Sequence, residues 1–404
     1  MPPTVETRTA RHASRRRRTR AALVLTLLSM AIVIGLGSLA WARRSRGPTP
    51  DAAPPVSRAA SPTPSPASST VSHPTSAPVT APVPAVAATL TVAGVGDMIF
   101  DRNVALLVRD RGGAAPLASV AGLLARADVT AGNLESPLSV RGERFPGKDV
   151  TFRGDPRAVA GLRAAGFDFI SLANNHVLDY GGIALTDTVS TLDEAGIAHA
   201  GAGADSAAAR RPALVSRRGA RVAYLAFSHV LPPGFVADAD SPGLAPGRGR
   251  PGEVAAAVRA AKRRADYVVV SFHWGVEYSP DATAEQVRDA RRAIDAGADL
   301  VLAHHPHVIQ GVERYHGGLI AYSLGDFVFD HYSRETGEAF VLTAEVGPSG
   351  VGSVGIVPVY LDGHGAPAVV TGTAAQRILE RLRRLSAARG TRIVISGDRA
   401  EVAR

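Results

Sequence analysis

Histidine and asparagine side chains follow three apolar segments of this sequence, in positions where they could bind a metal ion. The motifs are Asn174-Asn175-His176, His273-Trp274-Gly275 and His305-Pro306-His307. Each motif follows an apolar run of strand length, and open α/β sheets place their ligands at the carboxyl ends of strands. The sequence therefore predicts chemistry carried on loops over a rigid sheet.

Two carboxylates occupy comparable positions earlier in the chain. Asp97 follows the apolar segment that begins at Leu90, and Glu135 follows the next apolar segment. Each carboxylate could bind a cation, and each has a plainer explanation as a turn or helix-capping residue. Considered alone, neither residue defines a site.

The pair of histidines around Pro306 is the most informative motif. Alternate residues of an extended segment point to the same side, so His305 and His307 are predicted to bind one cation, with His304 outside the site. His273 considered alone is better explained as a core histidine packed beside Trp274, and it becomes a candidate ligand only together with the other motifs.

The predicted ligands combine carboxylate, amide and imidazole groups and contain no sulfur. They are Asp97, Glu135, Asn175, His273, His305 and His307. This mixture suits Mn, Fe or Zn, and two such ions could polarise a phosphoryl or acyl oxygen and bind a hydroxide. A hydrolase is therefore expected, with Glu277 as an acid or substrate contact and Asp179 orienting His176.

Apolar runs and helical patterns alternate through the first part of the globular region, which predicts a mixed α/β fold. Helices are expected near residues 116–125, 155–165, 182–195, 253–264, 283–296 and 374–387. Strands near 308–315, 319–323, 339–346 and 354–360 follow one another closely. These four strands predict a second, largely antiparallel sheet packed on the first.

The amino-terminal part has a different composition. It predicts a basic cytoplasmic tail (1–20), a transmembrane helix (21–42) and a disordered linker rich in Pro, Ala, Ser and Thr (43–87), before a domain spanning 88–404. The heavier basic flank precedes the apolar segment, so we expect a single-pass cell-membrane protein with an extracellular main domain. Arginines in the tail contribute much of the net charge of +9, so nucleic acid is not an expected partner.

The motifs, taken in order, resemble those of the bacterial capsule synthesis family, the CapA/PgsA-type proteins linked to poly-γ-glutamate capsules. The matching segments are Gly96-Asp97, Asn133-Leu134-Glu135, Asn174-Asn175-His176, His273-Trp274-Gly275, His305-Pro306-His307-Val308 and Tyr322-Ser323-Leu324-Gly325. The resemblance implies a metallophosphoesterase-like four-layer α/β/β/α sandwich of two mixed sheets. It also implies that the six predicted ligands hold metal and that His176 acts on the leaving group or stabilises charge.

Two residues depart from the family pattern. Ile99 stands where the phosphoesterase motif usually has a histidine, and Asp326 replaces the asparagine of a Leu-Gly-Asn-Phe motif. The resemblance implies a metal-dependent hydrolase of capsule or envelope polymer synthesis, acting on an anionic polymer or a phosphate ester. The alternatives are a non-catalytic polymer-binding member of a capsule synthesis complex and a phosphoesterase acting on an envelope phosphate ester.

Overall fold

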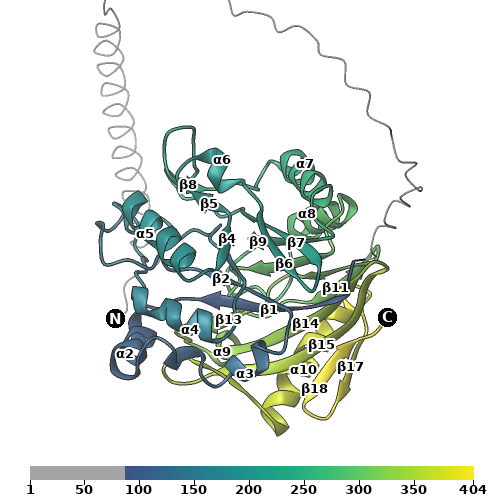
Figure 1. Ribbon diagram of the computed structural model, residues 1–404. Helices are drawn as coiled ribbons and strands as arrows, with labels where there is room; N and C mark the ends of the chain where they lie inside the picture. Colours follow the sequence, from purple (N-terminus) through teal and green to yellow (C-terminus); the bar gives the residue numbers. More distant parts are fainter. Residues whose placement is uncertain (1–86) are drawn as a thin grey trace, which may run out of the picture. The chain divides into compact units, whose positions relative to one another are not determined.

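The computed structural model describes residues 87–404, which contain two mixed β-sheets with helices on their outer faces (Figure 1). The larger sheet consists, in spatial order, of β17 (Ile393–Ser396), β18 (Arg399–Val402), β15 (Gly350–Leu361), β14 (Glu338–Gly347), β1 (Leu90–Met98), β2 (Val129–Leu134), β3 (Phe169–Ser171) and β4 (Ala198–Ala200). In addition, β13 (Asp326–Val328) pairs with β1, and β16 (Pro367–Val369) pairs with β15.

The smaller sheet has six strands. In spatial order they are β11 (Val312–Tyr315), β12 (Gly318–Ala321), β10 (Leu300–His304), β9 (Tyr267–His273), β7 (Ala220–Ser228) and β6 (Ala213–Arg217). Its central strands β7, β9, β10 and β12 run parallel. A separate two-stranded pair is formed by β5 (Ala202–Gly203) and β8 (Gly243–Leu244).

Three hydrophobic clusters define the layers. The first lies between the two sheets and includes Val92 of β1 and Leu302 of β10. The second packs the other face of the larger sheet against α2 (Arg102–Arg111), α3 (Ala121–Leu124), α4 (Val159–Ala164) and α5 (Gly181–Glu194). The third packs the smaller sheet against α7 (Pro251–Lys262) and α8 (Ala284–Asp295). Each sheet therefore buries both faces, which explains why its central strands read as continuous apolar runs.

The remaining helices are short or peripheral. They are α6 (Ser206–Ala209), α9 (Arg334–Gly337), α10 (Gly372–Ala387) and the 3-10 turns Ala115–Leu117 and Pro156–Ala158. The helix α10 places Ile378, Leu379 and Leu382 in the cluster between the sheets. Its apolar face closes that core on the side of β11 and β15.

The predicted mixed α/β class is confirmed, but the predicted division into sheets is wrong. The strands β11 and β12 extend the parallel sheet of β9 and β10, whereas β14 and β15 pair beside β1. Strand order in the sequence does not fix the sheet, because a chain can change sheets in one short connection. The helix α2 was not expected, since it is strongly charged and buries only Val104, Leu107 and Val108.

The predicted localisation is corrected by the structure. No helix within residues 87–404 is long and apolar enough to cross a bilayer, so a single-pass membrane protein with an external main domain is not supported. The predicted tail, transmembrane helix and linker lie outside the described residues, except for Ala87.

Candidate metal centre

The carboxyl ends of strands from both sheets meet at one place. In the larger sheet, Asp97 of β1 pairs in register with Asn133 of β2, and Glu135 directly follows β2. In the smaller sheet, His273 ends β9 and faces His304 of β10. The imidazole Nε2 of His304 lies 3.1 Å from the carbonyl oxygen of Val95, which connects the two sheets beside the site.

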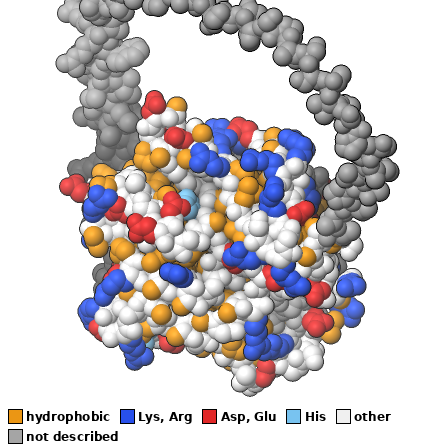
Figure 2. All heavy atoms as spheres, in the orientation of Figure 1, with side chains coloured by type: hydrophobic (Ala, Val, Ile, Leu, Met, Phe, Trp, Pro, Cys, Tyr) orange, Lys and Arg blue, Asp and Glu red, His pale blue; other side chains and the backbone are white. Residues whose placement is uncertain are grey.

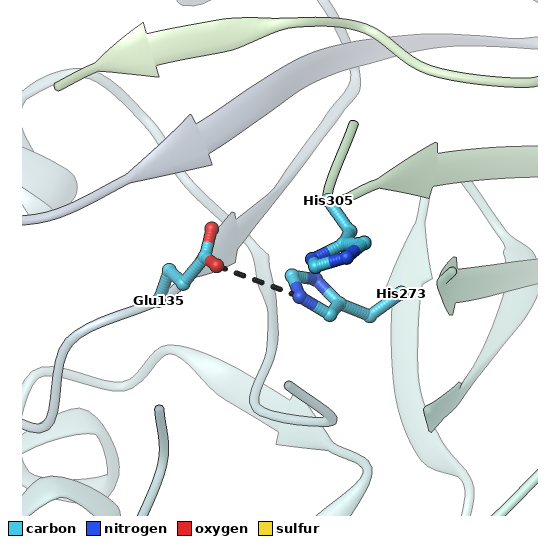
Figure 3. Close-up of side chains that lie close together, drawn as sticks. All are labelled: Glu135, His273 and His305. Carbon is cyan, nitrogen blue, oxygen red and sulfur yellow. Dashed lines mark ion pairs between the residues drawn. The ribbon is translucent and has the colours of Figure 1, made fainter. Parts of the chain in front are cut away.

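Glu135, His273 and His305 form the first group of close ligand atoms (Figure 3). One ligand atom from each residue lies within 4.8 Å of the others. The Oε1 atom of Glu135 is 3.4 Å from Nε2 of His273, and that nitrogen is 2.7 Å from Oδ1 of Asn175. Four atoms that usually bind metals therefore face one another in a buried space.

Asp97, Glu135 and His307 form a second group that shares the carboxylate of Glu135. The Oδ2 atom of Asp97 is 4.0 Å from Nδ1 of His307 and accepts a hydrogen bond from the backbone amide of His305 at 2.8 Å. Its Oδ1 atom accepts a hydrogen bond from Nδ2 of Asn133 at 2.7 Å. The structure thus brings all six predicted ligands to a single location.

The backbone around these ligands is not extended, contrary to the prediction for the histidine pair. His305 has a φ of 96° and His307 a φ of 56°, so both adopt left-handed conformations that are costly for residues with a Cβ atom. The two imidazoles nevertheless converge, with ring centroids 5.8 Å apart. Gly96 is required nearby, because a Cβ atom there would lie 1.9 Å from the carbonyl oxygen of Gly325.

Asp326 contacts one of the predicted ligands directly. Its Oδ1 atom lies 2.8 Å from Nδ1 of His307. Asp326 also pairs in register with Asp97, because β13 runs beside β1. Burial lowers the pKa of His307, but the carboxylates of Asp326 and Glu135 outweigh burial and raise that pKa. Asp326 therefore fixes the orientation of the His307 ring, in the way that carboxylates hold metal-binding histidines.

His176 lies beside the centre in a network of its own. Its Nδ1 atom is 2.6 Å from Oδ2 of Asp179 and 3.0 Å from Nζ of Lys148, which also pairs with Asp179. Burial lowers the pKa of His176 to about 4, against the opposing effect of Asp179. The imidazole is therefore neutral near pH 7, with Nδ1 engaged and Nε2 left to act as a proton acceptor.

A cavity of about 250 Å³ opens onto this centre. Its lining includes Asn175, His176, Glu277, Tyr278, His307, Asp326 and the basic residues Arg102 and Lys148. Glu277 is exposed, and one of its oxygens lies within 4.8 Å of ligand atoms of both His305 and His307. In the space-filling view, histidine atoms are visible in a hollow of the surface beside acidic atoms (Figure 2).

His304 and Ile99 lie close to the centre but take no part in it. His304 is fully buried, with Nδ1 3.2 Å from the Ser271 hydroxyl and Nε2 directed at the backbone of β1. Ile99 is also fully buried, in a cluster with Phe152, Phe329 and Leu361. The position at which the resemblance predicts a histidine is thus part of the apolar packing.

The contacts of several supporting residues could not be assigned from the sequence. Asn174 donates hydrogen bonds from Nδ2 to Oδ1 of Asn133 and to the carbonyl of Leu134, and its Oδ1 accepts from the amide of His176. Lys148 lies in an irregular loop, far from Asp179 in sequence. One feature of the sequence sets Lys148 apart: it is one of only two lysines in an arginine-rich chain.

The unsatisfied atoms of the centre show whether a metal would fit it. Both carboxylate oxygens of Glu135 and the Nδ1 atoms of His273 and His305 are buried, without hydrogen-bond partners in residues 87–404. Buried polar atoms are almost always paired, and an ion is one of the few partners that explain such exceptions. Carboxylate, amide and imidazole ligands match the preferences of Mn, Fe and Zn.

The fold and site define a mixed α/β protein with a buried histidine and carboxylate centre. The model of the family described as "Bacterial capsule synthesis protein PGA_cap" matches residues 91–331, which is more than half of the chain. The chain therefore belongs to this bacterial capsule synthesis family and is a CapA-type protein.

Three relatives illustrate the similarity. The capsule biosynthesis protein CapA of Bacillus anthracis is 32% identical over 70% of this chain and 70% of its own length. The PGA biosynthesis protein CapA of Bacillus subtilis strain 168 is 31% identical, over 67% and 71%. A probable polyglutamine synthesis accessory protein of Mycobacterium tuberculosis is 40% identical, over 53% and 58%.

Solved structures are much less similar. The protein TT1561 of Thermus thermophilus is 11% identical, covers 63% of this chain and 94% of that chain, and has a TM-score of 0.35. A similarity at this level does not identify the fold of this chain.

Proposed function

We propose that this chain is a metal-dependent, metallophosphoesterase-like hydrolase of capsule polymer synthesis. Glu135, Asn175, His273 and His305 would hold one divalent cation, and Asp97, Glu135 and His307 would hold a second, with Glu135 shared. When bound, such cations polarise a phosphoryl or acyl oxygen and lower the pKa of water. Mn, Fe and Zn are the candidates.

The observation that carries this proposal is that both carboxylate oxygens of Glu135 and the Nδ1 atom of His305 are buried without hydrogen-bond partners within residues 87–404. A carboxylate buried without a partner destabilises a fold by several kcal/mol in order of magnitude, so its retention requires compensation. A bound cation provides that compensation, and it would also account for the strained backbone conformation of His305.

The residues of the chain supply the other requirements of hydrolysis. His176 is held by Asp179 and Lys148, so its Nε2 atom can exchange a proton with a substrate or leaving group in the cavity. Arg102 and Lys148 attract anionic groups to the same cavity. Glu277 lies at its exposed side, where it can contact the substrate.

The names of the relatives point to the polymer. Two are named for capsule or PGA biosynthesis and one as a polyglutamine synthesis accessory protein. We therefore propose a polyglutamate or another anionic polymer as the substrate, and proteins of its synthesis complex as partners. A phosphate ester is the second candidate substrate, because the carboxylate, amide and imidazole set suits phosphoryl transfer equally well.

The decisive experiment uses the full chain, loaded separately with Mn²⁺, Fe²⁺ and Zn²⁺. Release of amino groups from γ-glutamyl oligomers and of nitrophenol from bis(p-nitrophenyl) phosphate is measured for each form. Turnover that depends on metal and is lost when His176 is replaced supports the proposal. Stoichiometric metal without turnover of either substrate would instead favour a non-catalytic polymer-binding protein, and absence of metal binding would refute the centre.

Asp326 offers a test of how the centre is held together. The substitution Asp326→Asn removes the charge that fixes His307, and we expect the affinity for the second cation to fall about 10- to 100-fold. Metal affinity is measured by competition with a chelator. The control is Asp330→Asn, which removes the same charge from the same cavity without touching His307. Equal affinities in the two variants would contradict the role of Asp326.

A further inference from the structure

A second cluster of potential metal ligands lies outside the centre described above. It consists of His229, which directly follows β7, and of Glu285 and Asp289, one turn apart on α8. One ligand atom from each of the three residues lies within 4.8 Å of the others. None of these residues has a part in the proposed hydrolysis.

The imidazole of His229 is buried and lacks a hydrogen bond. The residue is 5% exposed, and its ring packs edge-on against Phe272 and Trp274 at 5.6 and 5.4 Å. Its nearest charged atom within residues 87–404 is Oδ2 of Asp289, 4.0 Å from Nε2, which is beyond hydrogen-bond distance. The Nε2 atom of this largely buried side chain therefore lies near a carboxylate to which it makes no hydrogen bond.

The two carboxylates are also unpaired. Asp289 is 8% exposed, and neither it nor Glu285 makes a side-chain hydrogen bond within the described part of the chain. Burial raises the pKa of Asp289, and the exposed side chains of Arg248, Arg288 and Arg292 form no ion pair with either carboxylate in this part of the chain. Glu285 is half-buried, whereas the side chain of Asp289 is only 9% exposed. A carboxylate as buried as that of Asp289 usually has such a partner, so a missing ligand is indicated.

We propose that His229, Glu285 and Asp289 hold a divalent cation at a site separate from the candidate hydrolytic centre. One imidazole nitrogen and two carboxylate oxygens suit Mn²⁺ or Zn²⁺, with water completing the coordination.

The site has access to solvent and a structural consequence. A cavity of about 470 Å³ is lined by His229, Glu285 and His305, so an ion can enter from the surface. The backbone amide of His229 donates a hydrogen bond to the carbonyl of His273 at 2.9 Å. A cation here would tie the end of β7 to α8 and thereby support His273 beside the hydrolytic centre.

The test measures manganese bound by the full chain after chelator treatment and dialysis against Mn²⁺. A background variant, Glu135→Gln with His305→Ala and His307→Ala, removes the hydrolytic centre. We expect this background to retain about one equivalent of Mn²⁺, and to lose it when Glu285→Gln and Asp289→Asn are added. The matched control adds Glu253→Gln and Asp295→Asn, which remove the same charge from two exposed positions on α7 and α8.

Each result decides the proposal. No manganese in the folded background variant, or equal manganese in the E285Q/D289N and control variants, would overturn it and indicate a neutral His229 and Asp289 pair. If the background variant does not fold, the same two pairs of substitutions are compared in the unaltered chain, where E285Q/D289N should lose about one equivalent. Failure of the hydrolytic centre would be seen separately, as unchanged metal content after replacement of His305 and His307.

Discussion

Replacement of His305 and His307 together by alanine is expected to eliminate metal from the candidate metal centre while the domain remains folded. Each imidazole belongs to one of the two ligand groups that share Glu135, so both groups lose a ligand. The Nδ1 atom of His305 has no hydrogen-bond partner within residues 87–404, and His305 is not part of a hydrophobic cluster. Its loss therefore removes coordination and little packing.

The measurement is metal content by mass spectrometry, together with circular dichroism and thermal unfolding of the full chain. The matched control replaces two exposed histidines, His316 and His364, by alanine. The control should bind metal like the unaltered protein. A folded H305A/H307A protein that keeps all of its metal would show that these imidazoles are not ligands.

Most of the residues at the centre could be predicted from the sequence, because they follow apolar runs that are visible as local patterns. Each of the runs before Asn174, His273 and His305 is an apolar strand of a sheet buried on both faces. Parallel strands bring their carboxyl ends to one edge, so residues far apart in sequence meet there. The alternating pattern also predicted α5, α7, α8 and α10 to within a few residues.

Other features depend on contacts that no local pattern encodes. The assignment of β11, β12, β14 and β15 to different sheets is decided by packing around β1 and β10. The convergence of His305 and His307 was expected from an extended backbone, but two left-handed residues produce it. This conformation requires the surrounding loops to hold it, and a sequence pattern does not show that support.

The networks around His176 and His307 illustrate the same limit. Lys148 lies 31 positions before Asp179, and Asp326 lies 19 positions after His307, yet both pairs are in direct contact. These residues set the charge and orientation of the imidazoles. The chemistry of the centre therefore depends on partners that the ligand motifs do not contain.

Glu135 gives the sharpest test of whether the centre is built for metal, because one substitution should have opposite effects with and without it. Both oxygens of this carboxylate are fully buried and unpaired in residues 87–404, and burial and the carboxylate of Asp97 raise its pKa. In the metal-free protein, Glu135→Gln removes the cost of burying or protonating this carboxyl group, so we expect the free energy of unfolding to rise by about 1–3 kcal/mol.

In the presence of metal, the Glu135→Gln variant should instead be less stable than the unaltered protein. Glu135 belongs to both ligand groups, so its loss should reduce metal affinity by more than about 100-fold, beyond the effect of any supporting residue. Metal bound to the folded state stabilises the unaltered protein in proportion to its affinity, and the variant lacks that gain. Urea unfolding with chelator and with excess Mn²⁺ measures both effects. A variant that is less stable than the unaltered protein under both conditions would show that Glu135 serves packing and not coordination.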